Sequence, residues 1–293
     1  MKILVLGATG MAGHVISIYL SEVGHDVTAF SRRGFKYCNN IIGDVSNFPY
    51  LKDVIFEGNY DAVINAIGIL NKDADDNKAL AVLLNSYLPH YLSEITKDMK
   101  TKVIHMSTDC VFSGKEGGYT ETSFRDGSTF YDRSKALGEL ENSKDLTFRN
   151  SIIGPDLNNE GIGLFNWFMK QGGQINGFTK AIWTGVTTLT LAKAMDKALE
   201  EGITGLYNLV NNENISKYEL LKLFNKSMKG NSLTILPSDT FVVDKSLINN
   251  RNDFNFIVPS YEQMIIEMKE WIENHKELYP HYVKQQEDKR CVN

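Results

Sequence analysis

An apolar run that turns directly into a glycine loop constrains the fold of this chain more than any other stretch. Residues 2–6 read KILVL, residues 7–13 read GATGMAG, and apolar side chains then follow at helical spacing. A run that is apolar at every position is typical of a parallel strand covered on both faces. Strand, glycine loop and helix in this order predict a dinucleotide site, although glycines at such spacing are otherwise turn residues.

Each glycine of this loop has a separate predicted task. Gly7 allows the tight turn, Gly10 lets the backbone approach a pyrophosphate, and Gly13 lets the helix pack on the strand. The free N–H groups of the helix amino terminus then face the phosphates. The spacing is GxxGxxG and not the commoner GxGxxG. The loop residues predicted to bind the cofactor are Gly7, Thr9, Gly10, Met11, Ala12 and Gly13.

The end of the second predicted strand, residues 25–30, indicates which dinucleotide binds. An NAD site usually has an acidic residue here for the ribose 2′-hydroxyl, whereas this chain has Ser31, Arg32 and Arg33. Because a guanidinium pairs well with a phosphate, the sequence predicts NADP(H), with NAD(H) kept as an alternative. The alternative interpretation is that Arg32 and Arg33 only form a solvated turn. A third strand, residues 41–45, would bring Asp44 and Val45 to the adenine ring.

Further strand and helix patterns continue to about residue 112. Residues 61–68 read as a buried strand whose end, Ala66, Ile67 and Gly68, would lie under the cofactor. An acidic loop follows at residues 73–76, and then a helix over residues 79–97, with Asn85 as a further cofactor contact and Pro89 as a kink or break. Repeated units of this length predict an α/β doubly wound parallel sheet, a Rossmann fold, with ligands at the carboxyl ends of the strands.

Tyr131 and Lys135 are the candidate catalytic pair. In a helix they lie four residues apart on one face, although many helices contain such a pair by chance. An ammonium beside a phenol favours phenolate and is expected to lower the tyrosine pKa. The pair would suit proton donation to a carbonyl oxygen while a hydride arrives from elsewhere. Thr108 and Asp109 fall at the end of the strand over residues 102–106 and could meet the same carbonyl.

Composition excludes several other classes of function. The net charge of −5 gives no reason to expect nucleic acid or an acidic membrane surface as partner. Cys38, Cys110 and Cys291 are far apart and odd in number, which argues for a reducing compartment and against a structural metal or a disulfide framework. The apolar run of residues 3–6 is too short for a signal peptide or a membrane span, so we expect a cytoplasmic protein.

The carboxyl-terminal half predicts a smaller, non-contiguous α+β substrate-binding domain. The nucleotide domain would comprise residues 1–150 and a return over residues 182–212, because an amphipathic helix at 187–200 leads to a strand at 206–210. Residues 151–181 and 213–293 would form the second domain. Its aromatic cluster at residues 165–169 is either core or the rim of a cleft or dimer surface. His275 and His281 are read as surface residues, and the last ten or so residues as frayed.

Three of these motifs, GATGMAG, STDCVFSG and YDRSK, together resemble an extended short-chain dehydrogenase/reductase, and in particular the dTDP-4-dehydrorhamnose reductase family. WTGVTTLTLAKAM from Trp183 and NISKYELLKLF from Asn214 are also similar to that family. The chain departs from it at Cys110, where an aromatic residue is usual, and over residues 65–69.

The resemblance implies a role for each matching residue. Tyr131 would be the general acid for a 4-keto oxygen and would also contact the cofactor, and Lys135 would bind the nicotinamide ribose and lower the tyrosine pKa. Thr108 would hold the carbonyl oxygen, and Asp109 would serve substrate or proton relay. The residues expected at the substrate are Val111, Phe112, Asn150, Ser151 and Trp183, with a structural role equally open for the last three.

The implied activity is NADPH-dependent reduction of a nucleotide-linked 6-deoxy-4-ketosugar for surface polysaccharide, as in dTDP-rhamnose biosynthesis, with a homodimer as an open alternative to a monomer. Two other functions stay open: a nucleotide-sugar epimerase or dehydratase, and an NADP-binding regulatory subunit without turnover.

Overall fold

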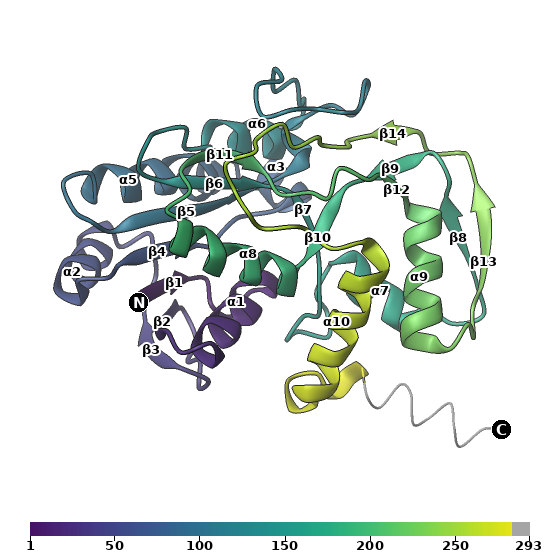
Figure 1. Cartoon of the computed structure of the whole chain (residues 1–293), viewed down its shortest axis with the longest axis horizontal. Coiled ribbons are helices and arrows are strands. Elements are labelled where there is room, and N and C mark those ends of the chain that lie inside the picture. Colours follow the sequence, from purple (N-terminus) through teal and green to yellow (C-terminus); the bar gives the residue numbers. More distant parts are fainter. Residues whose placement is uncertain (283–293) are drawn as a thin grey trace.

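A seven-stranded parallel sheet forms the centre of the molecule in the computed structural model, which describes residues 1–282 (Figure 1). Its order is β11-β6-β5-β4-β1-β2-β3, and every neighbouring pair is parallel. The strands are β1 (Lys2–Leu6), β2 (Asp26–Ser31), β3 (Asn39–Ile42), β4 (Ala62–Asn65), β5 (Lys102–Ser107), β6 (Leu146–Arg149) and β11 (Gly205–Asn208). The doubly wound Rossmann class predicted from the sequence is confirmed.

Helices cover both faces of this sheet, which explains why β1 is apolar throughout. Ile3 and Val5 belong to the core shared with α1 (Met11–Glu22) and α8 (Thr188–Glu201). Leu4 and Leu6 point to the opposite face and pack in the core shared with α2 (Phe48–Gly58) and α5 (Leu88–Ile95). Successive strand residues point to opposite faces, so a strand buried between two helical layers has no polar position.

The helical region after β4 differs from its prediction. The acidic stretch expected as a loop lies in a short helix, α3 (Asn71–Asp76), and the single helix expected over residues 79–97 is three segments: α4 (Lys78–Ala81), a π-helix (Val82–Tyr87) and α5. Pro89 is the second residue of α5 and has no N–H for the helix ladder. Gly138 packs on the Asn85 carbonyl in that region: a Cβ built on Gly138 would stand 1.9 Å from the Asn85 oxygen.

The carboxyl-terminal part of the described chain forms small sheets and further helices beside the central sheet (Figure 1). The strands pair as β7 (Ser151–Ile153) with β10 (Gly185–Thr187), β8 (Gln174–Phe178) with β13 (Thr234–Ser238), and β9 (Ala181–Trp183) with both β12 (Ile215–Ser216) and β14 (Val243–Asp244). The helices are α7 (Leu164–Lys170), α9 (Lys217–Lys229) and α10 (Tyr261–Asn274), with short 3-10 turns at Asp109–Val111 and Lys276–Leu278.

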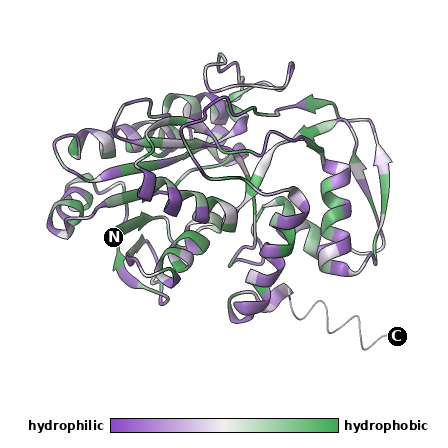
Figure 2. Cartoon of the chain, in the orientation of Figure 1, coloured by the Kyte–Doolittle hydropathy of each residue, from purple (hydrophilic) through white to green (hydrophobic). Residues whose placement is uncertain are grey.

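One apolar core joins these helices to the central sheet. Phe165 and Phe168 of α7 and Phe224 of α9 are fully buried in the same core as Ile3, whereas Trp167 is 41% exposed. The aromatic cluster of α7 is therefore mainly core. Figure 2 shows hydrophilic and hydrophobic residues together on α9 and α10, as expected of helices with one buried face.

Two predictions about organisation have different outcomes. The chain does return to the first sheet, because β11 pairs with β6. The domain boundaries themselves stay a prediction.

His275 is not a free surface residue, since its ring contacts Glu22 Oε1 at 2.7 Å. Cys291 and the predicted frayed end lie outside the described residues. Within residues 1–282, no helix has both the length and the apolar character that a membrane span requires.

Candidate active site

A cavity of about 590 Å³ opens at the carboxyl ends of four adjacent strands, β3, β2, β1 and β4. This is the position where the order of the sheet reverses and where open α/β sheets bind ligands. The structure brings ten of the predicted cofactor residues to its wall. They are Gly7, Thr9, Gly10, Ser31, Arg32, Asp44, Val45, Ala66, Ile67 and Gly68.

The glycine loop is closed by a backbone contact that only glycine permits. Gly7 has φ of +83°, and a Cβ on Gly13 would stand 2.2 Å from the Gly7 carbonyl oxygen. Met11, Ala12 and Gly13 form the first turn of α1, where Ala12 and Gly13 are buried. All three were predicted to bind the cofactor, but of the loop only Gly7, Thr9 and Gly10 line the cavity, and Met11, Ala12 and Gly13 instead seat the helix amino terminus.

A buried network fixes this loop from the far end of the chain. His14 Nδ1 lies 2.9 Å from the Gly10 carbonyl oxygen, and His14 Nε2 lies 2.8 Å from the Tyr279 hydroxyl. Trp271 Nε1 donates to the same hydroxyl at 3.0 Å. Sequence reasoning missed His14, because its partner is 265 residues away in the chain.

The two arginines after β2 are placed differently. Arg32 lines the cavity, whereas Arg33 is exposed and contributes its carbonyl oxygen, which accepts from Ser31 Oγ at 2.6 Å. Asp44 stands on the same wall, and hydrogen bonds from Ser46, together with the Arg32 charge, hold the pKa of that carboxyl below its usual range. The structure therefore supports Arg32, and not Arg33, as the residue beside a bound ligand.

Tyr131 is on the first turn of α6 (Phe130–Leu137), whose start is fixed by a capping box between Thr129 and Asp132. Its ring is 7% exposed and packs with Ile69, which also lines the cavity. The Thr108 side chain lies close enough to the phenol to lower its pKa, while its hydroxyl donates to Asp109 Oδ1 at 3.1 Å. The two predicted residues thus lie together behind the cavity wall, where Tyr131 packs on Ile69.

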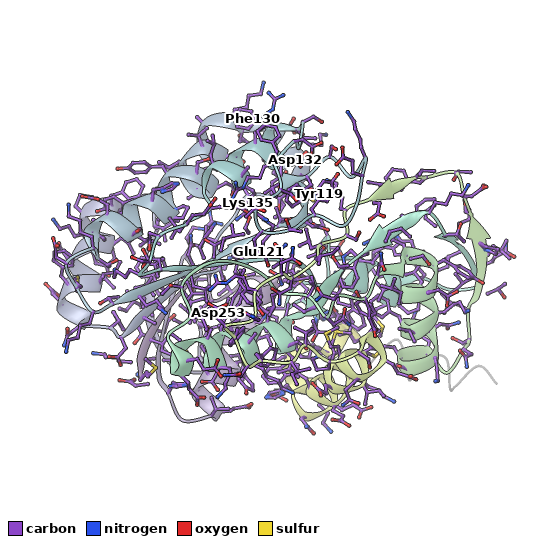
Figure 3. All side chains as sticks on the ribbon, turned by 45° about the horizontal axis from the view of Figure 1, so that its top comes forward. Tyr119, Glu121, Phe130, Asp132, Lys135 and Asp253 are labelled. Carbon is purple, nitrogen blue, oxygen red and sulfur yellow. The ribbon has the colours of Figure 1, made fainter. Side chains whose placement is uncertain are left out.

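The expected lowering of the Tyr131 pKa is not what the structure indicates. Burial raises the pKa of the phenol, with a further rise from the neighbouring Cys110, and Thr108 opposes this only in part. The reason is that the Lys135 ammonium is directed elsewhere: its Nζ donates to the Met106 carbonyl oxygen at 2.6 Å. Lys135 of α6 is 5% exposed, and burial lowers its pKa to about 8. Figure 3 labels it with Phe130 and Asp132 of the same helix.

Asn85 has a different place from the predicted one. Its side-chain amide bonds the backbone N–H and the carbonyl of Ile69, each at 2.9 Å, and donates to Ser134 Oγ at 3.0 Å. It is fully buried. Asn85 thus joins the loop after β4 to α6, and it acts on the cofactor region through Ile69 and not by direct contact.

Positive charge gathers on the side of Thr108 that faces the carboxyl-terminal half. Burial raises the pKa of Asp109, while the charges of Lys217 and Lys245 lower it. Lys217 opens α9, and its Nζ lies 5.5 Å from the centre of the Trp183 ring. Lys217 stands in the NISKYELLKLF stretch, but no local pattern places it or Lys245 beside Asp109, because only the fold brings them there.

The predicted substrate residues separate into buried apolar side chains and two polar residues, Asn150 and Ser151. Val111 and Phe112 are fully buried in an apolar cluster, where Phe112 stacks on Tyr119 at 4.2 Å, so their side chains belong to the core and not to a substrate surface. Trp183 is also buried, at 2% exposed. Ser151 opens β7 and is half-buried. The Asn150 amide is buried, and neither its nitrogen nor its oxygen has a hydrogen-bond partner among the described residues.

Fold and site together define the class: a Rossmann protein of the short-chain dehydrogenase/reductase type, with threonine, tyrosine and lysine close to a cavity at the strand ends. The model of the family "RmlD substrate binding domain" matches residues 1–247. The chain belongs to this family.

Individual relatives agree with this assignment. The chain is 26% identical to the probable low-salt glycan biosynthesis reductase Agl14 of Haloferax volcanii over 71% of this chain and 74% of that protein. It is 28% identical to a dTDP-4-dehydrorhamnose reductase of Mycobacterium tuberculosis, but that alignment covers 47% of this chain and only 44% of the relative. The crystal structure of a Bacillus anthracis dTDP-4-dehydrorhamnose reductase in complex with NADP superposes with a TM-score of 0.77 at 22% identity, covering 93% and 99% of the two chains, which shows the shared fold.

Proposed function

We propose that this protein is an NADPH-dependent reductase of the 4-keto group of a nucleotide-linked 6-deoxysugar. The observation that carries the proposal is that Thr108 lies beside Tyr131, which packs on Ile69 of the cavity wall, with Lys135 buried one helical turn further along α6. Relatives named as dTDP-4-dehydrorhamnose reductases and a glycan biosynthesis reductase support the sugar class. Action in the cytoplasm and assembly into a homodimer stay predictions.

The residues around the cavity fit a dinucleotide with a 2′-phosphate. The backbone leaves no room for a Cβ at Gly7, which makes the tight turn, or at Gly13, where the helix packs on the loop, and both contacts present Gly10 to a pyrophosphate. Thr9 and Gly10 would hold the phosphates, Arg32 the 2′-phosphate, Asp44 and Val45 the adenosine, and Ala66 to Gly68 the nicotinamide side. When bound, the reduced nicotinamide supplies a hydride to the carbonyl carbon.

The protein's own groups would supply the proton and stabilise the developing oxyanion. Because burial raises the pKa of Tyr131, the phenol is protonated at neutral pH and is able to donate to the carbonyl oxygen. Thr108 would offer a second hydrogen bond to the same oxygen. Lys135, whose pKa is about 8, is mostly charged at neutral pH and would bind the ribose hydroxyls while offsetting negative charge on the phenol.

The charges beside Asp109 fit a substrate with negative charge close to the sugar. Two lysine side chains, Lys217 and Lys245, act on the one carboxylate of Asp109. A nucleoside diphosphate sugar places its phosphates one sugar ring away from the 4-keto carbon, so these ammonium groups are candidates to hold them.

Purified protein tests the proposal when it is given NADPH and dTDP-4-dehydrorhamnose or a related 4-ketosugar. We expect oxidation of NADPH in equal amount to sugar reduced. Tyr131→Phe should lower kcat by about 10²–10⁴-fold, the usual contribution of a general acid, while leaving NADPH affinity unchanged. Tyr50→Phe, at a tyrosine that is 39% exposed on α2, is the matched control and should keep full activity.

The other two functions give different results in the same assay. An epimerase or dehydratase would convert the sugar without net consumption of NADPH. A regulatory subunit would bind NADPH and reduce none of a panel of nucleotide sugars. Full activity of Tyr131→Phe would contradict the assigned mechanism even if the protein were a reductase.

A further inference from the structure

A buried chain of polar side chains connects the cofactor loop after β4 to Lys135. Asn65 ends β4 and His105 lies beside it on β5, as partners in the parallel register. Asn65 Nδ2 lies 3.2 Å from His105 Nδ1, and His105 Nε2 lies 3.5 Å from Lys135 Nζ. Asn65 and His105 are fully buried and Lys135 is 5% exposed. No step of the proposed reaction uses Asn65 or His105.

The Asn65 amide has only one orientation that satisfies its neighbours. The backbone N–H of Ile67 donates to Asn65 Oδ1 at 3.2 Å, so the oxygen faces Ile67 and the NH₂ group faces His105. An NH₂ group can only donate, and His105 Nδ1 must therefore accept and carry no proton. In the neutral ring the proton is then on Nε2, the nitrogen that faces Lys135.

This tautomer acts on the charge of Lys135. The Nε2–H group of His105 points at Lys135 Nζ. It repels Nζ when the lysine is a charged ammonium, and it donates a hydrogen bond to Nζ when the lysine is a neutral amine. In both states Nζ still donates to the Met106 carbonyl oxygen. Burial and Lys135 hold the pKa of His105 well below its usual range, so the ring is neutral. The other ionisable groups that act on this pair are Glu139, beyond the end of α6, which favours the charged lysine, and His90 on α5, which disfavours a charged His105.

We propose that His105, held by Asn65 in its Nε2–H form, is a positioning residue that limits how strongly Lys135 keeps its proton. Because Ile67 lines the cavity and also bonds Asn65, the same chain of contacts ties the place of the cofactor loop to the state of the lysine. The link to catalysis rests on the proposed function. The tautomer itself does not depend on any activity.

Nitrogen NMR of the full-length protein with ¹⁵N-labelled histidine tests the tautomer directly. The His105 signals are those lost in His105→Gln. We expect a neutral ring with an unprotonated Nδ1 and a protonated Nε2 at neutral pH. A protonated Nδ1, or a charged ring, would overturn the proposal. This outcome is independent of whether any sugar is reduced, so a failed reductase assay counts only against the proposed function.

Asn65→Asp tests the effect on the lysine with almost no change of shape. A carboxylate accepts from Ile67 N–H and also from Nδ1–H, so it should move the ring proton to Nδ1 and leave Nε2 as an acceptor for the Lys135 ammonium. We expect the alkaline limb of kcat, which lies near the Lys135 pKa of about 8, to move upward by about one pH unit, with KM for NADPH nearly constant.

Asn225→Asp is the matched control, because Asn225 is also buried and its amide also bonds backbone groups, here the N–H and carbonyl of Leu233. It should lower thermal stability and leave the alkaline limb in place. A switched tautomer in Asn65→Asp with an unmoved limb would overturn the proposed action on Lys135. If Asn65→Asp does not fold, the wild-type tautomer still decides for or against the placement of His105.

Discussion

Acidification should destabilise this protein through His14, the buried histidine that contacts the glycine loop. The Gly10 carbonyl only accepts, so His14 Nδ1 carries the ring proton, and His14 Nε2 accepts from the Tyr279 hydroxyl. Trp271 Nε1 in turn donates to the Tyr279 oxygen. Every polar atom of this network is therefore satisfied by a neutral ring, and a second proton on His14 would face a hydroxyl oxygen that already accepts.

The size of the effect follows from the pKa of His14, which burial lowers from 6.5 to about 4. For a base whose folded-state pKa lies below its unfolded value, the unfolded chain takes up the proton first. The contribution to stability is therefore complete above pH 6.5 and is lost as the pH falls from 6.5 to about 4. That interval, 6.5 − 4 = 2.5 pH units, corresponds to about 3 kcal/mol of unfolding free energy.

Urea unfolding of wild type and His14→Gln, from neutral pH down to about pH 4, measures this contribution. Glutamine takes no proton, so the variant should be less stable at neutral pH, and the difference should shrink by about 3 kcal/mol toward the acidic end. Asn225→Ala, which removes buried hydrogen bonds to Leu233 but no titratable group, should differ from wild type by a constant amount. Parallel curves for wild type and His14→Gln across the whole range would refute the reasoning.

Three further variants address the cofactor and substrate sides. Gly13→Ala puts a Cβ 2.2 Å from the Gly7 oxygen and should lower the free energy of unfolding in urea by about 1–3 kcal/mol. Gly172→Ala, in open space, should lower it by almost nothing, and equal stabilities of the two variants would contradict the contact. Arg32→Ala should weaken NADPH binding about tenfold or more in calorimetric titrations and leave NADH unchanged, and an equal loss for both would exclude a 2′-phosphate contact. Lys217→Met should raise KM for the nucleotide sugar about tenfold with NADPH affinity constant; an unchanged KM would remove Lys217 from the substrate site.

The parts of the site that the sequence predicted are those that follow from the order of strands. Gly7, Ser31, Asp44 and Ala66 each come directly after, or at the end of, a strand pattern, and the carboxyl ends of parallel strands meet at one edge of a sheet. Their convergence on one cavity needed no knowledge of side-chain packing. Thr108 and Tyr131 meet for a related reason, because Thr108 follows β5 and α6 returns across that strand end.

Other features depend on depth of burial or on distant partners, which no local pattern contains. The Tyr131 pKa has the opposite direction from the predicted one, because burial outweighs a lysine that is bonded to Met106 instead. Asn85 was expected at the cofactor, but a π-helix turns it toward Ile69 and Ser134. The acidic residues 73–76 look like a loop by composition, yet they form α3 against α6.

The π-helix at Val82–Tyr87 makes chain length, and not only residue type, a requirement of this site. A π-turn holds about one residue more than an α-turn, and each residue advances a helix by about 100°. Deleting a single residue between Val82 and Asn85 would give a more regular helix, but it would rotate Asn85 away from Ile69 and Ser134. The Asn85 carbonyl on which Gly138 packs would move with it. An insertion or deletion in this turn should therefore be more harmful than most substitutions, because it separates the loop that borders the cavity from the helix that holds Tyr131 and Lys135.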